Sequence, residues 1–207
     1  MKKIIIVGAG EQGRVILDYV SQLEDCEVEG FLDDSLEEEI NGVPILGKVK
    51  DARFDSEKNY FVAFGNNSLR GKIIEEIKKQ GGKLETIVNP SAIISKTAEI
   101  GEGTSVGAGA IICNDSKIGE GVIIDTGAII EHDNEIGNYV NVSPGSVTMG
   151  GVKIGKYSWI SGGVKIGEDL EIGKNSVIGL GSVVLKNISD NVVAYGVPAE
   201  IKRKNNQ

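Results

Sequence analysis

An aliphatic residue returns at every sixth position through most of the second half of the chain. The series runs without a change of phase from Ile100 to Val184, and only Thr148 interrupts it. Glycine follows many of these residues directly, as at Gly101, and a small residue such as Ala128 stands two places before many of them. A period of six matches neither the 3.6 residues of an α-helix nor the alternation of a strand. It predicts a chain that turns a corner every six residues and points one aliphatic side chain inward on each flat segment.

Three such segments close a triangular coil of eighteen residues, so residues eighteen apart are expected to stack. One predicted column consists of Ile100, Ile118, Ile136, Ile154 and Ile172. The run is long enough for about five coils of a hexapeptide parallel β-helix, a repeat architecture that buries its core only by stacking its coils. An irregular glycine-rich chain would not keep an aliphatic residue in phase for so long.

The first part of the chain has a different pattern, typical of an α/β unit. Residues 3–7 are predicted to be a buried strand, and the glycine-rich segment 8–13 follows at once. Apolar residues then recur at helical spacing, and residues 28–32 are predicted to be a second strand that ends in Asp33 and Asp34. A glycine turn that opens a helix can receive a phosphate at the helix N-terminus. An acidic residue after the second strand is the usual partner of a ribose.

Two further predicted strands, residues 60–64 and 84–88, flank a helix whose inward side chains begin at Leu69. Ligands collect at the carboxyl ends of parallel strands, where segments 8–13, 33–34 and 65–68 all lie. About four strands are too few for two mononucleotide-binding halves, so a nucleotide linked to something other than nicotinamide is favoured over NAD. A glycine turn that serves packing alone is the alternative. We predict a Rossmann-like nucleotide-sugar-binding domain at residues 1–90 and a β-helix domain with a short tail at residues 91–207.

Composition narrows the choice of partners. The net charge of −8 over 207 residues disfavours nucleic acid and anionic membranes, which require clustered Lys and Arg. No apolar run approaches the ~20 residues of a membrane helix. Cys26 and Cys113 lie far apart and show no Cys/His metal spacing, so we expect neither a metal site nor a disulfide. Unpaired cysteines are typical of a reducing compartment, and we therefore expect the protein to be cytoplasmic. The basic residues 202–204 are expected to be a solvated tail.

His132 is the single histidine of the chain and lies two positions after Ile130 inside the repeat. The inward positions are occupied by the aliphatic series, so the imidazole should lie at a corner, within reach of solvent. An imidazole can accept a proton near neutral pH, and the adjacent Asp133 would raise its basicity. Gly150 is one coil further on, where its N–H could donate to an oxyanion. A surface histidine without a role is the alternative. Neither cysteine has a neighbouring histidine in the sequence, which favours direct group transfer.

The chain resembles the hexapeptide-repeat sugar O/N-acetyltransferases, the group of the sialic acid O-acetyltransferases and the bacillosamine-pathway N-acetyltransferases. The resemblance covers nearly the whole chain and rests on the segments Gly8–Gly13, Phe31–Asp34, Gly65–Asn67, Ile130–Asp133 and Gly196–Ala199. It implies a left-handed β-helix, although generic parallel crossovers are right-handed. It also implies acetyl-CoA as co-substrate and a homotrimer with acetyl-CoA in a groove between neighbouring β-helices.

The resemblance also implies roles for individual residues. His132 would be the general base, Asp133 would raise its basicity, and Asp125 would lie near the sugar amine. The residues that would hold the nucleotide-linked sugar are Gly10, Glu11, Gln12, Asp33, Asp34 and Gly65. Those that would line the acetyl-CoA site are Asn141, Gly150, Gly162 and Leu180, of which the last two are eighteen apart and should stack. Family members often have histidine in place of Gln12 and Asn141, which leaves the sugar and one CoA contact open.

The function expected from these features is transfer of acetyl from acetyl-CoA to the amine of a nucleotide-linked amino sugar of the 4-amino-4,6-dideoxy type. A first alternative keeps the fold and acetylates a hydroxyl of sialic acid or another small acceptor. A second is a non-catalytic trimeric scaffold that binds a nucleotide, and an NAD-dependent dehydrogenase is a distant further possibility.

Overall fold

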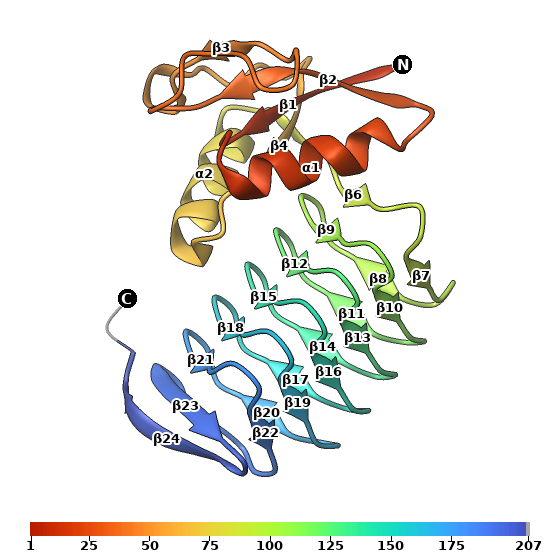
Figure 1. The fold of residues 1–207 in the computed structure, drawn as a ribbon, viewed down its shortest axis with the longest axis vertical. Coiled ribbons are helices and arrows are strands. Elements are labelled where there is room, and N and C mark those ends of the chain that lie inside the picture. The colour runs from red at the N-terminus through yellow and green to blue at the C-terminus, as the bar shows by residue number, and fades with distance from the viewer. Residues whose placement is uncertain (206–207) are drawn as a thin grey trace. The chain divides into compact units, whose positions relative to one another are not determined.

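A computed structural model describes residues 1–205 of the chain. The chain divides into two compact units, Met1–Pro90 and a second unit that begins at Ser91 (Figure 1). The first unit is an α/β fold and the second is a solenoid of short strands, so the change of pattern in the sequence coincides with the boundary between the units.

The first unit is built on a parallel sheet with the strand order β3-β2-β1-β4-β5. Its elements are β1 (Lys2–Val7), α1 (Glu11–Ser21), β2 (Cys26–Leu32), β3 (Ile45–Gly47), the 3₁₀ helix η1 (Val49–Asp51), β4 (Asn59–Val62), α2 (Asn67–Lys79), β5 (Lys83–Leu84) and β6 (Ile87–Val88). The core forms where the buried stripe of α1 packs on the sheet, as Ile16 and Val20 do against Ile4, Ile6 and Phe31. The carboxyl ends of β1, β2 and β4 therefore share one edge of the sheet.

Three details of this unit differ from the sequence prediction. The strand predicted at residues 84–88 is two short strands, because the chain leaves the sheet after the N–H of Glu85 donates to the carbonyl of Tyr60. β3 was not predicted from the sequence. Leu69 was predicted to face the core, but it lies outside the narrow stripe that its helix buries and is 42% exposed.

Three parallel sheets form the solenoid within residues 91–205, and each contributes one face of a triangular prism (Figure 1). The apolar face consists of β7 (Ile93–Ile94), β10 (Ile111–Ile112), β13 (Ile129–Ile130), β16 (Val147–Thr148), β19 (Lys165–Ile166) and β22 (Val183–Val184). The charged face consists of β8 (Glu99–Ile100), β11 (Lys117–Ile118), β14 (Glu135–Ile136), β17 (Lys153–Ile154) and β20 (Glu171–Ile172). The third face contains β9 (Ser105–Val106), β12 (Ile123–Ile124), β15 (Asn141–Val142), β18 (Trp159–Ile160) and β21 (Val177–Ile178).

Each strand pairs with the strand eighteen residues away, as Ile118 does with Ile136. The second residue of nearly every two-residue strand is buried, which makes the aliphatic series the core of the prism. The small residues two places earlier lie inside the corners. There the hydroxyls of Ser116, Ser146 and Ser158 each donate to the carbonyl fifteen positions later, at 2.7–2.9 Å. Size and hydrogen bonding together explain why these corner positions favour small residues.

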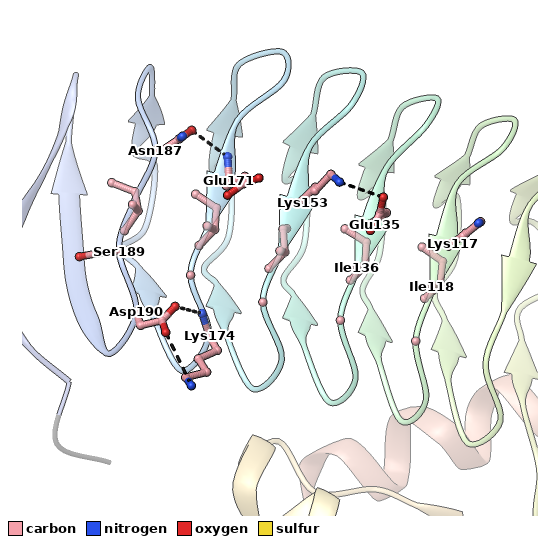
Figure 2. Close-up of a pocket in the computed structure, with 17 residues that line it drawn as sticks. Lys117, Ile118, Glu135, Ile136, Lys153, Glu171, Lys174, Asn187, Ser189 and Asp190 are labelled. Carbon is pink, nitrogen blue, oxygen red and sulfur yellow. Dashed lines mark hydrogen bonds and ion pairs between the residues drawn. The ribbon is translucent and has the colours of Figure 1, made fainter.

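The first residue of each strand points outward and gives each face its character. On the charged face the outward residues alternate in sign from coil to coil: Glu99, Lys117, Glu135, Lys153 and Glu171. Figure 2 shows this face, with the ion pair of 3.1 Å between Lys153 and Glu135. On the apolar face the outward residues are Ile93, Ile111, Ile129, Val147, Lys165 and Val183, so a single charge occurs on that whole face.

A hairpin lies at the C-terminal end of the prism. β23 (Val192–Gly196) extends the third face parallel to β21, and β24 (Ala199–Lys204) runs back antiparallel to it. Residues 202–204 were predicted to be a solvated tail. Their side chains are exposed, as expected, but the turn at Gly196–Ala199 returns these residues as a paired strand and not as a free tail. Within residues 1–205, no helix combines the length and the apolar character needed to cross a bilayer.

Candidate functional site

His132 lies at the corner where the apolar face meets the charged face, between β13 and β14. Its side chain is 55% exposed, and Asp133 beside it is 64% exposed. Asp133 has φ +58°, the left-handed conformation that Asp tolerates better than most residues, and this conformation turns the chain at the corner. The imidazole is thus carried on the outside of a rigid prism, within reach of a ligand.

The carboxylate of Asp133 fixes the imidazole. Its Oδ2 lies 2.8 Å from Nδ1 of His132. This hydrogen bond is the main cause that raises the pKa of His132 above its ordinary value of 6.5; slight desolvation opposes it, and the charges of Asp133, Glu131 and Glu168 add to it. With Nδ1–H donated to Asp133, the neutral ring has its lone pair on Nε2, which faces away from that carboxylate. The pair therefore presents a basic nitrogen to the solvent.

Gly150 packs directly against the imidazole. A Cβ built on Gly150 would lie 2.5 Å from Cε1 and 2.8 Å from Nε2 of His132, so a residue with any side chain would displace the ring. The N–H of Gly150 donates to no protein group among residues 1–205. A basic nitrogen and a free amide donor are therefore neighbours on one surface.

Glu168 and Asp169 complete the surroundings of His132. Together with His132, Asp133, Gly150 and Gly151 they line a pocket of about 470 Å³. The sequence interpretation missed both, although the period of the repeat locates them, because they follow His132 and Asp133 by two coils. Their charges make this corner acidic and suit a cationic or amine-bearing ligand.

A larger hollow of about 1000 Å³ runs along the charged face (Figure 2). Its lining alternates Lys117, Glu135, Lys153 and Glu171 with the glycine corners and includes no imidazole or thiol. Hydrogen bonds and ion pairs between coils, such as that from Lys174 to Asp190, already engage part of its charge. Size alone therefore does not identify the reactive site, and the chemistry favours the smaller pocket.

Asp125, predicted to lie near the sugar amine, and two of the predicted acetyl-CoA residues lie elsewhere on the prism. Asp125, Gly162 and Leu180 follow strands of the third face and occupy the opposite edge of the apolar face from His132. A Cβ on Gly162 would lie 3.2 Å from Cδ1 of Leu180, so these two residues stack, and Leu180 is 82% exposed. Within one chain, the structure does not bring these residues to His132.

Asn141 is outward on β15 and buried to 9% exposure among its neighbours on the third face. Its Oδ1 accepts the hydroxyl of Ser143 at 3.2 Å, and the same hydroxyl oxygen accepts the indole N–H of Trp159 at 2.8 Å. Asn141 therefore belongs to a polar cluster on the third face, whereas His132 lies where the other two faces meet.

In the first unit, the predicted nucleotide residues gather at one edge of the sheet. Gly10 caps α1 without a side-chain hydrogen bond, and no atom lies within 4 Å of a Cβ built on it. Glu11 and Gln12 form the first turn of α1, whose N–H groups have no partner inside the helix. Gly13, in contrast, packs against the carbonyl of Gly8. The turn thus uses some glycines for packing and leaves the helix N-terminus open.

Asp33 has a different environment from the one expected for a ribose ligand. Its Oδ2 accepts the N–H of Ala9 at 2.8 Å, and its Oδ1 accepts the N–H groups of Ser35 and Leu36 at 2.8 and 3.0 Å. Burial alone would raise the pKa of Asp33, but the three backbone hydrogen bonds outweigh it and the pKa is lowered. The carboxylate therefore holds the glycine turn in place.

Asp34 and Gly65 are exposed at the same edge of the sheet. Oδ1 of Asp34 accepts the N–H of Lys50 at 3.1 Å, and no atom lies within 4 Å of a Cβ built on Gly65. The sequence interpretation missed Arg70, which is fully buried and donates to the carbonyl of Phe64 at 2.8 Å and to Oδ1 of Asn67 at 2.9 Å. Arg70 thereby fixes the loop that carries Gly65.

The two cysteines are free, and neither has a lowered thiol pKa. Burial, followed by the charge of Glu131, raises the pKa of Cys113 and keeps its thiol protonated. Within residues 1–205, no group of three or more His, Cys, Asp and Glu side chains is arranged to hold a metal ion.

Comparisons with known proteins cover both units. Residues 3–77 match the family model described as the PglD N-terminal domain. Over 111 residues the chain is 37% identical to the UDP-N-acetylbacillosamine N-acetyltransferase of Bacillus subtilis, and this alignment spans 51% of each protein, about half the length of that curated relative.

Solved structures resemble the chain over nearly its full length. The acetyltransferase domain of PglB from Neisseria gonorrhoeae has a TM-score of 0.93 at 31% identity and covers 98% of this chain and 100% of its own; it has also been solved with acetyl coenzyme A. A mutant of perosamine N-acetyltransferase from Caulobacter crescentus, in complex with CoA and GDP-perosamine, has a TM-score of 0.93 at 32% identity and covers 98% and 97%. These likenesses confirm the predicted α/β unit followed by a left-handed β-helix.

Proposed function

Because the chain belongs to the hexapeptide-repeat sugar acetyltransferases, we propose that it transfers acetyl from acetyl-CoA to the amine of a nucleotide-linked amino sugar. The observation that carries the proposal is the exposed imidazole of His132, held by Asp133 and packed against Gly150, whose N–H donates to no protein group among residues 1–205. The relatives with bound CoA or acetyl-CoA, and the one with bound GDP-perosamine, support both substrate classes.

In the proposed reaction His132 is the general base. Its Nε2 accepts a proton as the amine nitrogen attacks the thioester carbonyl carbon, and Asp133 stabilises the imidazolium that forms. The raised pKa makes His132 a stronger base than a free imidazole. The acidic neighbours Glu168 and Asp169 favour an acceptor that carries an amine over one that carries a carboxylate.

The N–H of Gly150 supports the second part of the reaction. Attack converts the carbonyl oxygen into an oxyanion, and a fixed amide donor beside the base stabilises that charge. When the carbon–sulfur bond breaks, the CoA sulfur leaves as a thiolate and takes the proton back from Nε2 of His132. Atoms and charge balance without an acyl-enzyme intermediate, and the raised pKa of Cys113 disfavours the thiolate that such an intermediate would need.

The first unit would hold the nucleotide part of the substrate. The open N-terminus of α1 at Gly10, Glu11 and Gln12 suits a phosphate, and Asp34 and Gly65 are exposed at the same edge of the sheet. Asp33 would act there by fixing the glycine turn, because its carboxylate is engaged by three N–H groups.

A homotrimer would complete the site. Rotation about a three-fold axis parallel to the prism leaves the position of each residue along that axis unchanged. If the charged face lay at the axis, each Glu would therefore face the same Glu of the other two chains, and each Lys the same Lys. The apolar face avoids this repulsion and exposes a stripe of Ile and Val that monomers seldom leave uncovered. With three apolar faces around the axis, the His132 edge of one chain meets the Asp125, Gly162 and Leu180 edge of the next.

Product analysis by mass spectrometry, with a panel of nucleotide-linked 4-amino sugars and acetyl-CoA, tests the proposal. An increase of one acetyl group on an amino sugar is expected, and His132→Ala should reduce turnover by ~10²–10⁴-fold with its circular dichroism unchanged. Acetylation of sialic acid but of no amino sugar would replace the amine by a hydroxyl as acceptor. Binding of a nucleotide without binding of acetyl-CoA would reduce the protein to a scaffold.

A further inference from the structure

We propose that Asn134 is a positioning residue that aims the N–H of Gly150 at the reacting carbonyl. The inference rests on the acetyl transfer proposed above and assigns a role to a residue that touches neither substrate. Asn134 is fully buried inside the corner that carries His132. It occupies an inner corner position of the repeat, and the other such positions from Ala98 to Ser182 hold alanine, serine, threonine, valine or leucine, so Asn134 is the only amide side chain among them.

The side-chain amide nitrogen of Asn134 lies within hydrogen-bond distance of three backbone carbonyl oxygens. Its Nδ2 lies 2.7 Å from the carbonyl oxygen of Glu131, 3.1 Å from that of His132 and 2.9 Å from that of Met149. The first two belong to the corner that carries the base, and the third belongs to the next coil. One side chain therefore joins the two coils at the level of the candidate site.

The bond to Met149 determines where the N–H of Gly150 points. The carbonyl of Met149 and the N–H of Gly150 belong to the same peptide group, which is planar and trans, so the two bonds point in opposite directions. Asn134 holds the carbonyl inward, and the N–H is consequently directed outward, to the pocket that His132 and Gly150 line. Loss of this anchor would let the peptide group rotate and misaim the donor.

The same geometry recurs in the repeat and supplies the conservative variant. Ser116 precedes Asn134 by one coil and donates to the carbonyl of Glu131, fifteen positions later, as Asn134 does to Met149. A serine at position 134 can therefore hold the carbonyl of Met149. Val152 follows Asn134 by one coil and is fully buried. A valine therefore fits position 134 but cannot donate a hydrogen bond to the carbonyl of Met149.

The test compares Asn134→Val and Asn134→Ser with Ser158→Ala as control. Ser158 makes the equivalent corner bond, to the carbonyl of Gly173 at 2.7 Å, at a corner remote from His132. Removal of an oxyanion donor costs about 10²–10³-fold in kcat, and a misaimed donor should cost less. We expect Asn134→Val to reduce kcat about ten- to a hundredfold, with KM for both substrates and the acid limb of the pH profile unchanged. Asn134→Ser should restore kcat to within a few-fold, and Ser158→Ala should leave it unchanged.

The amide resonance of Gly150 gives a readout that does not depend on catalysis. In nitrogen-15-labelled protein it should shift in Asn134→Val, return in Asn134→Ser and stay in place in Ser158→Ala. If wild-type protein transfers no acetyl group, the proposed function fails and this resonance alone decides the positioning role. An unmoved resonance, or an Asn134→Val enzyme as fast as Ser158→Ala, overturns the inference. Should the valine variant not fold, Asn134→Ala takes its place, because Ala98 occupies the same corner two coils earlier.

Discussion

Substitution of Gly150 by alanine isolates the contact between the base and its neighbour. The φ of Gly150 lies outside the left-handed region, so alanine fits the backbone, and the N–H that would bind the oxyanion remains. The new methyl group would lie 2.5 Å from Cε1 of His132, whereas ordinary contacts begin at 3.4 Å. The ring must therefore retreat by about 0.9 Å, the difference between these distances. A displacement of ~1 Å between reacting groups can cost about 10²-fold in rate.

Steady-state kinetics with a saturating amino-sugar acceptor should therefore show kcat for Gly150→Ala reduced by about two orders of magnitude, with a melting temperature close to that of the wild type. Gly167→Ala is the matched control. A Cβ at Gly167 would make only ordinary contacts of 3.4 Å, and the residue lies outside the pocket. Unchanged turnover in Gly150→Ala would show that the position of the imidazole against Gly150 does not matter to the reaction.

Other substitutions test the charges and the core. Asp133→Asn removes the negative charge and weakens the hydrogen bond that together raise the pKa of His132. Since a general base must be neutral, the acid limb of kcat/KM should move to lower pH, and a limb that stays in place would exclude His132 as its source. Asp33→Asn weakens the hydrogen bond from the N–H of Ala9, so KM for the nucleotide sugar should rise while KM for acetyl-CoA stays constant. Folding lowers the pKa of Asp33. The stability that this carboxylate contributes should therefore be present above its unfolded pKa and should be lost as the pH falls through its folded pKa. Thr148 buries a hydroxyl with no partner among the described protein atoms, so Thr148→Val should stabilise the chain by about 1–3 kcal/mol in urea unfolding, and a lower midpoint would contradict this.

The solenoid was predictable to the residue because its geometry is periodic. A repeat of six on three faces fixes a stacking distance of eighteen residues, and this distance alone places Gly150 beside His132 and Gly162 beside Leu180. The corner position of His132 follows from the same arithmetic, because the inward positions are already filled. No comparable rule exists for the α/β unit or for the hairpin after the repeat, and the errors in the predicted elements occur there.

Residues whose partners are backbone groups were the harder ones to assign. Asp33 follows the second strand where a ribose ligand is expected, yet its oxygens accept three N–H groups of the turn and the loop. Arg70 looks like a solvated helix residue in the sequence but is buried because loop carbonyls accept its guanidinium. Both roles depend on where loops pass in space, and one sequence does not record this.

The position of His132 and Gly162 on opposite edges of the apolar face leads to a prediction that a single-chain site cannot satisfy. If neighbouring chains complete each site, His132→Ala and Gly162→Phe alter different halves of that site, and each variant alone should have little activity. Chains mixed before reassembly should then regain activity, because a His132→Ala chain still offers an intact Gly162 edge to the His132 edge of a Gly162→Phe chain. Random mixing in equal amounts would restore about a quarter of the sites in a closed ring of identical contacts. Mixtures of each variant with itself control for the reassembly. If no activity returns although size-exclusion chromatography of differently tagged chains shows mixed oligomers, the two edges do not act on one site.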